Sequence, residues 1–450
     1  MSKKPSVSEF GYKEELQRSL SLRDLVVYGM IFMVPIAPFG IYGYVAEGAK
    51  GMVALAYLIG MTGMIFTALS YRQMSRAFPI AGSVYSYAQR GIHPSVGFFA
   101  GWVVLLDYIL VPSLLYIVSA NALQSLLPGV PAWIWLILFI AINTAINIRG
   151  IEFTAKANLI ILVFELIVLL LFIVIGIIAI NKGVGSGFTF KPVYDSGSFS
   201  LSLVMGAVSL AVLSFLGFDG ISTLAEETKG GKETVGKAAI YSLLIVGALF
   251  IVQTWVAAMI WPDYTSFKNP DIAFYQIAEL AGGVWLKNLC IIATAISWGL
   301  ANALAAQAAI SRILFSMGRD RNLPSVLAKV HPKYKTPYLS TLIVGGVSLI
   351  VGLVFMSMTS ALTSLVNFGA LSAFLLLHIS VIYHFIGKKK SKNYIGHLVL
   401  PAIGFAIIGY VVFSLDILSI SLGLAWLGIG VIYFVYMRFT KKNVSFEETM

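Results

Sequence analysis

A carboxylate between two glycines interrupts an otherwise apolar stretch of this sequence. Residues 201–215 are nearly all Leu, Val, Ala, Ser and Gly, as in a membrane-spanning helix, and Asp219 then follows between Gly217 and Gly220. Gly lowers helix stability by about 1 kcal/mol relative to Ala, and a charge at the bilayer centre costs about 2.5–3.5 kcal/mol. Both are tolerated where the backbone unwinds and lines a cavity. Such a segment could bind both ends of a small polar solute; a glycine kink with a paired carboxylate is the simpler alternative.

A second interruption lies in the apolar stretch 24–46. Pro35 and Pro38 lie within four residues of each other, and each removes a backbone donor and clashes with the preceding turn. We therefore expect unpaired carbonyl groups near residues 29–32. Interrupted helices at corresponding places in two halves of a chain are typical of inverted-repeat transporters, which bind their solute near the bilayer midplane between the interruptions.

Three more polar residues lie inside predicted spans. Asp107 could bind a ligand or pair with a neighbouring Tyr or Ser. Glu165 lies among Ile, Leu, Val and Phe, with no basic residue within a turn; because burial disfavours a charged carboxyl, it could carry a proton, and a neutral, hydrogen-bonded Glu is the alternative. Asn302 could face the cavity, or it could serve helix packing.

The composition indicates a polytopic membrane protein with a single membrane domain. Of the 450 residues, 58% are hydrophobic and 11% are charged, with a mean hydropathy of +0.88, whereas a soluble protein has about 25% charged residues. The apolar segments are evenly spread, with short connectors. The single cysteine, Cys290, excludes a disulfide framework and a cysteine-based metal site.

Twelve stretches are long and apolar enough to span a bilayer. They are 24–46, 52–71, 95–126, 132–149, 156–181, 200–227, 236–261, 284–316, 338–357, 361–386, 396–415 and 418–438. With the N-terminus inside, only five of the 31 Lys and Arg residues fall outside, so the positive-inside rule places both termini in the cytoplasm. The net charge of +11 then needs no nucleic-acid partner.

This topology divides the chain into four parts. Residues 1–22 form a cytoplasmic tail, 23–386 a ten-helix transport core, 387–440 two appended helices, and 441–450 a second cytoplasmic tail. The sequence contains no GxxxxGK[ST], HExxH or GxSxG motif, so neither ATP-driven transport nor enzyme activity is indicated. No cofactor or metal site is predicted. Secondary transport is favoured over a channel or a receptor.

Four ordered motifs resemble the amino acid–polyamine–organocation superfamily of permeases. They lie at residues 78–87 (FPIAGSVYSY), 96–102 (VGFFAGW), 214–219 (SFLGFD) and 311–320 (SRILFSMGRD). Residues 105–108 (LLDY) and 367–370 (NFGA) are most similar to bacterial putrescine importers. The resemblance implies an all-α fold of twelve transmembrane helices, a five-plus-five inverted repeat with broken helices one and six, and alternating access that is usually proton-coupled.

The resemblance also implies roles for particular positions. The residues that match the family's two helix breaks, and with them a substrate site, are Gly29, Met30, Ile31, Leu213, Ser214, Phe215, Gly217, Phe218 and Asp219. Phe215 or Phe218 could gate that site, and Asp219 matches a position linked to substrate or proton sensing. Glu165 stands roughly where many proton-dependent relatives carry a lysine, which leaves the coupling mechanism open.

We therefore expect a cytoplasmic-membrane importer of an amino acid or a polyamine such as putrescine. The resemblance implies an aspartate late in helix one of putrescine importers, where this chain has Gly40, so a neutral or aromatic amino acid stays open as the substrate. The substrate site should include Asp107 and Asn302 beside the two breaks. Asp219 should act on substrate or gate and Glu165 should carry the proton; amine exchange without net import is the alternative. The sequence does not indicate an oligomeric state.

Overall fold

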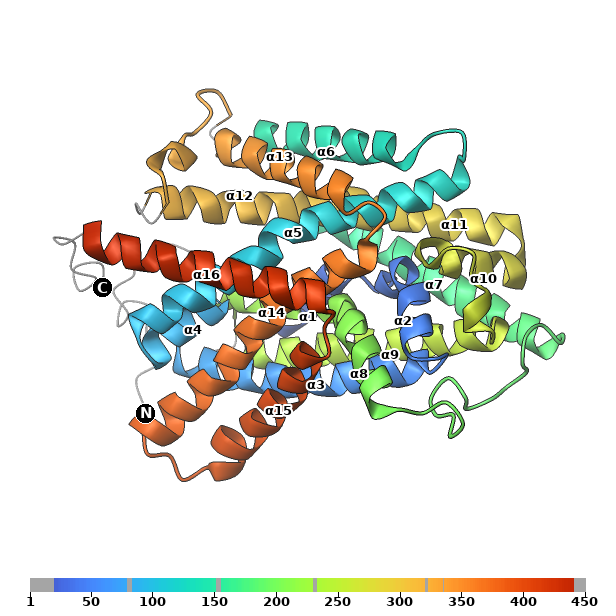
Figure 1. Ribbon diagram of the computed structural model, residues 1–450, viewed down its shortest axis with the longest axis horizontal. Coiled ribbons are helices and arrows are strands. Elements are labelled where there is room, and N and C mark those ends of the chain that lie inside the picture. The colour runs from blue at the N-terminus through green and yellow to red at the C-terminus, as the bar shows by residue number, and fades with distance from the viewer. Residues whose placement is uncertain are drawn as a thin grey trace.

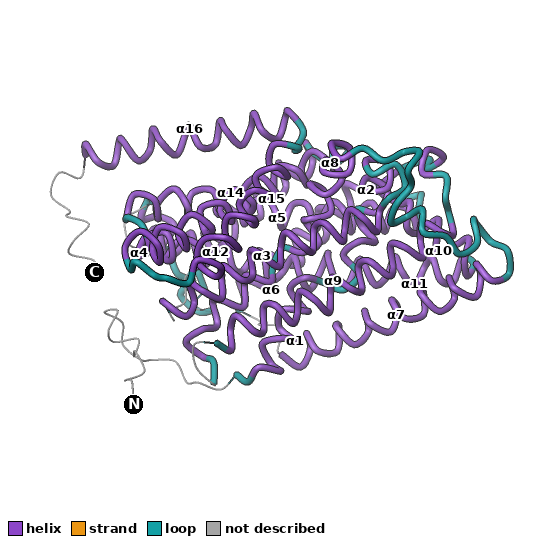
Figure 2. Tube along the Cα trace, turned by 90° about the horizontal axis from the view of Figure 1, so that it is seen from below, coloured by secondary structure: helices purple, strands orange, loops and turns teal. Residues whose placement is uncertain are grey.

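The computed structural model describes residues 20–78, 83–150, 155–229, 233–319, 323–334 and 336–440. Within these ranges the chain is helical, and its only β-type pairing is an isolated bridge between Leu20 and Thr228. The predicted tails 1–22 and 441–450 lie almost wholly outside the described residues. Figure 1 shows long helices packed side by side around α5 (Pro94–Leu126), and in Figure 2 the last helix, α16 (Ile417–Thr440), runs along the outside of the bundle.

Among the described residues, ten helical segments are long and apolar enough to cross a membrane, and two shorter apolar helices accompany them, Leu201–Phe215 and Tyr338–Val354. Each of the twelve predicted spans coincides with one of these segments. The helices not yet placed are α3 (Val53–Ala77), α4 (Ser83–Gly91), α6 (Ala132–Arg149), α7 (Ala155–Asn181), α9 (Thr234–Ile260), α10 (Ala273–Gly282), α11 (Val284–Thr294), α12 (Ala303–Arg319), α13 (Tyr338–Val354), α14 (Thr359–Val381) and α15 (Leu400–Phe413).

The first span is broken, but later than the sequence suggested. Helix α1 runs through Leu22–Met33, and the 3₁₀ turn η2 (Ala37–Gly40) leads into α2 (Tyr42–Gly48). The break is at Val34, whose φ of 52° is in the left-handed region. The expectation of unpaired carbonyls at residues 29–32 was wrong for Met30, whose carbonyl accepts from the amide of Val34 at 3.1 Å. The donor that Pro35 lacks would serve the carbonyl four residues earlier, that of Ile31, whereas Val34 keeps its N–H and bonds to Met30.

The break in the sixth span is where the sequence predicts it. Helix α8 (Leu201–Ala211) tightens into the 3₁₀ turn η3 (Val212–Phe215), and a second 3₁₀ segment, η4, covers Phe218–Glu227. Gly217 separates them with a φ of 109°, a conformation that only glycine adopts without strain. The interruption predicted from the glycines beside Asp219 is therefore confirmed.

A third irregularity lies in the eighth span. Between α11 and α12 the chain forms a π-helical segment, η7 (Ala295–Asn302). π-helical segments are rare in proteins, and those that occur are frequently found at functional sites. Asn143 of α6 donates to one of these carbonyls, that of Gly299, at 2.9 Å. Figure 1 places α6, α12 and α13 together on one side of α5 and α3, α8 and α9 on the other.

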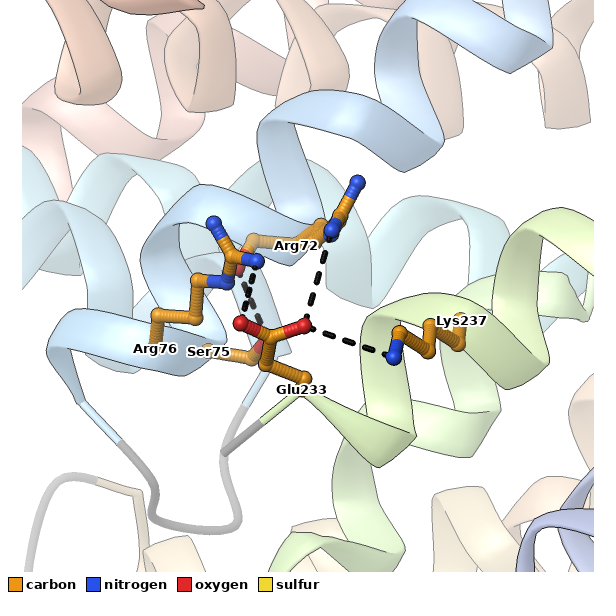
Figure 3. Close-up of polar contacts among 5 residues, drawn as sticks. All are labelled: Arg72, Ser75, Arg76, Glu233 and Lys237. Carbon is orange, nitrogen blue, oxygen red and sulfur yellow. Dashed lines mark hydrogen bonds and ion pairs between the residues drawn. The ribbon is translucent and has the colours of Figure 1, made fainter. Parts of the chain in front are cut away.

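Helices α3 and α9 pack along each other and are joined at one end by a charge cluster (Figure 3). The carboxylate of Glu233, which precedes α9, lies 2.8 Å from Arg76, 3.5 Å from Lys237 and 3.7 Å from Arg72. The hydrogen bond and charge of Arg76 hold the pKa of Glu233 below its usual range. Glu233 therefore forms ion pairs with both helices at one end, on the face that the sequence predicts to be cytoplasmic.

Candidate functional site

The two helix breaks lie against each other. A Cβ atom on Gly217 would be 3.0 Å from the carbonyl oxygen of Phe32, in the last turn of α1. A Cβ on Gly220 would be 3.6 Å from the ring of Phe32. The glycines around Asp219 therefore permit the backbone of the sixth span to approach the first span closely, which places the unwound segments of both spans at one point of the bundle.

Asp219 is held at this point by backbone amides and by a side chain. The amide of Gly217 donates to Oδ1 at 3.3 Å, and the hydroxyl of Tyr71, on α3, donates to Oδ2 at 3.4 Å. Asp219 is only partly buried, and no ion pair to it is found in the described residues.

A second carboxyl group, Asp107 on α5, belongs to the same region. Its Oδ1 is buried and has no hydrogen-bond partner among the described residues. A Cβ on Gly369 of α14 would be 2.8 Å from the backbone nitrogen of Asp107, so α14 closes one side of this residue. Asp107 and Asp219 are near enough to repel each other, and Tyr108 lies near both. No ion pair involving either carboxyl is found in the described part of the chain.

A small pocket on the other side of the first break contains Glu165. Its lining residues come from α1, α7, η7 and α12 and are Ile31, Phe32, Val34, Ile161, Leu162, Glu165, Ser297, Ala301, Asn302 and Ala305. The free space for the centre of a water molecule is about 30 Å³, which is room for about two waters and too little for an organic solute. Glu165 is 4% exposed, and its Oε2 has no hydrogen-bond partner among the described residues.

Phe32 connects the two regions. It lines the Glu165 pocket, its carbonyl oxygen faces Gly217, and its ring packs against Tyr28 with the centroids 4.6 Å apart. The sequence-predicted residues Ile31 and Asn302 lie on the Glu165 side, while Asp107 and Asp219 lie on the other. The predicted residues thus form two adjacent groups rather than one site.

Several predicted side chains point into the helix packing instead. The hydroxyl of Ser214 lies 3.2 Å from that of Tyr57 on α3, and Phe215, 0% exposed, packs against Tyr57 and Phe250. Phe218 is also fully buried and packs edge-on against Tyr71. These contacts leave the backbone of this segment, rather than the rings of Phe215 and Phe218, as the part available to a solute.

The remaining predicted positions have packing contacts as well. A Cβ on Gly29 would be 2.5 Å from Ile221 and 2.7 Å from Ser242, so Gly29 permits α1 to approach η4 and α9. Met30 and Leu213 are partly buried against the hydrophobic core. Sequence reasoning missed Phe32 and Tyr71. Phe32 is in the interrupted stretch and could have been included, whereas nothing in the local sequence marks Tyr71.

A hydrogen bond and an aromatic cluster lie at the second half of the broken first span. Tyr44 on α2 donates to Asp271 of the 3₁₀ turn η6 (Pro270–Ile272) at 2.9 Å. The ring of Phe39 stacks on Phe274 of α10 at 4.0 Å, and Phe172 of α7 packs against both. The second half of the broken first span is therefore held against the α9–α11 connection on the predicted outer face.

Known proteins match this chain over almost its whole length. The family model for amino acid permeases matches residues 25–439. The low-affinity putrescine importer PlaP of Escherichia coli (strain K12) is 34% identical over 436 residues, which cover 95% of each chain. The branched-chain amino acid permease BcaP of Bacillus subtilis (strain 168) is 28% identical over 458 residues, 95% of this chain and 94% of BcaP.

The similarity extends to a third kind of transporter. The methylthioribose transporter of Bacillus subtilis (strain 168) is 28% identical over 469 residues, 97% of each chain. The family match, the apolar helices and the coverage of these relatives agree on a multi-pass cell-membrane transporter that is not an enzyme. This chain accordingly belongs to the amino acid permease family of the amino acid–polyamine–organocation superfamily.

Proposed function

We propose that this protein is a secondary transporter that imports a small amine-bearing solute by alternating access. The observation that carries the proposal is the contact between the two helix breaks, with Asp219 and Asp107 beside it and no cationic partner for either in the described residues. Discontinuous helices of this kind form midplane binding sites in inverted-repeat transporters. Twelve crossings, a five-plus-five repeat and two cytoplasmic termini complete the proposal.

The two carboxyl groups favour a diamine as the solute. Neither carboxyl has a cationic partner in the described residues, and a dication could pair with both of them. A zwitterionic amino acid would bring a third carboxylate, which only the backbone amides of the breaks could bind. PlaP, named as a putrescine importer, supports the diamine.

An amino acid is the second candidate for the solute, and the packing around Gly40 favours it. The resemblance implies an aspartate in putrescine importers where this chain has Gly40, but a Cβ atom on Gly40 would lie 2.5 Å from Val118 and 3.4 Å from Trp298, which leaves no room for a side chain. The relative BcaP is named as a branched-chain amino acid permease. The number of ammonium groups on the solute is therefore the property to test.

We assign proton coupling to Glu165. Its pocket adjoins the first helix break through Ile31 and Phe32 and has space for water but not for the solute. A buried carboxyl with an unpartnered oxygen can take up a proton from such a water and release it when the pocket opens to the other side. Coupling would then arise because both the proton and the solute lie against the same moving backbone.

Uptake into proteoliposomes tests the proposal. The purified protein should concentrate [14C]putrescine or a 14C-labelled amino acid when the outside is acidic, and an uncoupler should abolish accumulation. Failure to take up any amino acid or polyamine, with or without a proton gradient, would overturn it. Equal counterflow with no net accumulation in any gradient would instead identify an exchanger. Competition between putrescine and leucine decides between the two solute classes.

A further inference from the structure

Tyr71 of α3 contacts Asp219 from outside the two broken helices. Its hydroxyl lies 3.4 Å from Oδ2 of Asp219 and 3.3 Å from the hydroxyl of Ser83, the first residue of α4. Because an ionised carboxylate can only accept, the single proton of Tyr71 must point to Asp219. Ser83 must then donate to Tyr71, so the two hydrogen bonds run in one direction, from Ser83 through Tyr71 to Asp219.

The ring of Tyr71 is fixed by aromatic side chains from three elements. It packs edge-on against Tyr87 of α4 at 6.0 Å, Phe218 of η4 at 5.8 Å and Phe374 of α14 at 6.1 Å. The residue is 3% exposed. Edge-to-face aromatic contacts at these distances have a preferred orientation, so the hydroxyl is held in place rather than free to rotate away from Asp219.

Ser83 has an unusual backbone conformation. Its φ is 54°, in the left-handed region that non-glycine residues seldom adopt. This conformation is strained, and it persists where surrounding contacts require it. Its hydroxyl is thereby placed at the junction of α3, α4 and η4, where the bond to Tyr71 becomes possible.

We propose that Tyr71 is a positioning residue for Asp219, oriented in turn by Ser83. Tyr71 fixes Oδ2 while the amide of Gly217 fixes Oδ1 at 3.3 Å, so the carboxylate is presented to an ammonium group in one orientation. These hydrogen bonds also connect the solute-binding carboxylate to α4, the short helix between α3 and α5. This inference rests on the proposed function, in which Asp219 binds the ammonium group.

A neighbouring pair on the same helix supplies a matched control. Tyr57 and Ser214 also form a buried tyrosine–serine hydrogen bond between α3 and the sixth span, at 3.2 Å, but no hydrogen bond from either to a carboxylate is found in the described residues. Tyr71→Phe and Tyr57→Phe therefore remove the same atom from similar surroundings. Only the first should affect solute binding.

The test is a set of initial rates of [14C]putrescine uptake by proteoliposomes. Tyr71→Phe should raise KM about tenfold, the usual effect of losing a hydrogen bond to a charged group, with Vmax within about twofold of wild type. Ser83→Ala should raise KM about threefold alone and add nothing to Tyr71→Phe, because it acts through that hydroxyl. Tyr57→Phe should leave KM unchanged.

Three outcomes would overturn the positioning role: an unchanged KM in Tyr71→Phe, an equal rise in Tyr57→Phe, or additive effects of Ser83→Ala and Tyr71→Phe. Asp219→Asn separates this result from the proposed function. If Asp219→Asn raises KM but Tyr71→Phe does not, only the positioning role fails; if Asp219→Asn leaves KM unchanged, the binding role of Asp219 fails. Thermal unfolding midpoints identify any variant that has lost its fold.

Discussion

The carbonyl oxygen of Phe32 lies 3.0 Å from the place where Gly217 would carry a Cβ atom. Two backbones approach this closely only if one residue has no side chain. Because Gly217 also has a φ of 109°, two separate requirements select glycine here. The contact joins the interrupted parts of the first and sixth spans, which are about 185 residues apart in sequence, at the point where we propose the solute site.

Gly217→Ala should abolish transport and lower thermal stability. The left-handed conformation costs an L-residue about 1–2 kcal/mol, and the contact with Phe32 adds to this. Two alanine variants separate the causes. Gly183 has a φ of 90°, and a Cβ atom there would have no atom of the described residues within 4 Å. Gly129 has neither a positive φ nor a close contact at its Cβ position. Gly183→Ala should lose a little stability and keep uptake, and Gly129→Ala should change neither. Normal uptake by Gly217→Ala would show that the close contact is not required.

The sequence was sufficient to find the sixth break, because Gly217, Asp219 and Gly220 cannot all belong to a continuous membrane helix. It was less accurate for the first break, since the donor missing at Pro35 would serve Ile31, four residues earlier, whereas Met30 accepts from the amide of Val34 and remains helical. The direction of each side chain around the break was not predictable. Ser214 and Phe215 point toward α3 and α9 because those helices pack there, which depends on contacts distant in sequence.

The role of Tyr71 was not predictable for the same reason, because it depends on contacts distant in sequence. It lies on an ordinary apolar helix, and its position beside Asp219 depends on how α3 packs against η4. Glu165 was identifiable, since a carboxyl within an apolar span is a functional candidate by itself. Its placement with Asn302 in one pocket required the π-helical segment η7, which no sequence pattern indicated.

Glu165→Gln should separate binding from coupling. The amide has the shape of the protonated carboxyl but cannot release a proton, so the variant should retain solute binding and counterflow. It should lose accumulation driven by an acidic outside. Asn302→Ala, which changes another polar residue of the same pocket without removing an acid, should keep the dependence on the proton gradient. Concentrative uptake with an unchanged pH profile in Glu165→Gln would place the proton path elsewhere.

The diamine assignment predicts different effects for two solutes at the aspartates. Asp107→Asn and Asp219→Asn should each raise KM for putrescine about tenfold or more, because a charge-assisted hydrogen bond is lost. If the solute is an amino acid with one ammonium group, only one of the two variants should show this loss. Inhibition of uptake by putrescine and by 1-aminobutane, its counterpart with one amine, measures the difference directly.

The pair formed by Tyr44 and Asp271 should influence which face of the bundle is open. Tyr44→Phe removes the 2.9 Å hydrogen bond between α2 and η6 but leaves the stacked rings of Phe39 and Phe274 in place. The closed outer end should therefore be weakened and not lost. Asn302→Cys labelled with an impermeant thiol reagent reports this change, because the native Cys290 is buried. Tyr44→Phe should speed labelling from outside severalfold, and an unchanged rate would exclude a closing role.

The cluster around Glu233 predicts a pH dependence of stability. The pKa of Glu233 is lowered from its ordinary value of 4.5, first by the hydrogen bond and charge of Arg76. A lowered pKa means that the folded state favours the ionised form, so the contribution of Glu233 is complete above pH 4.5 and is lost as the pH falls through the lowered value. Glu233 is exposed and the pairs are screened, so the effect should be small and should decrease at high salt. Glu233→Gln should thus lower the unfolding midpoint slightly at pH 7 and low salt, with the difference from wild type shrinking as the pH falls through the lowered pKa; a difference that persists in strong acid would assign the loss to packing rather than to charge.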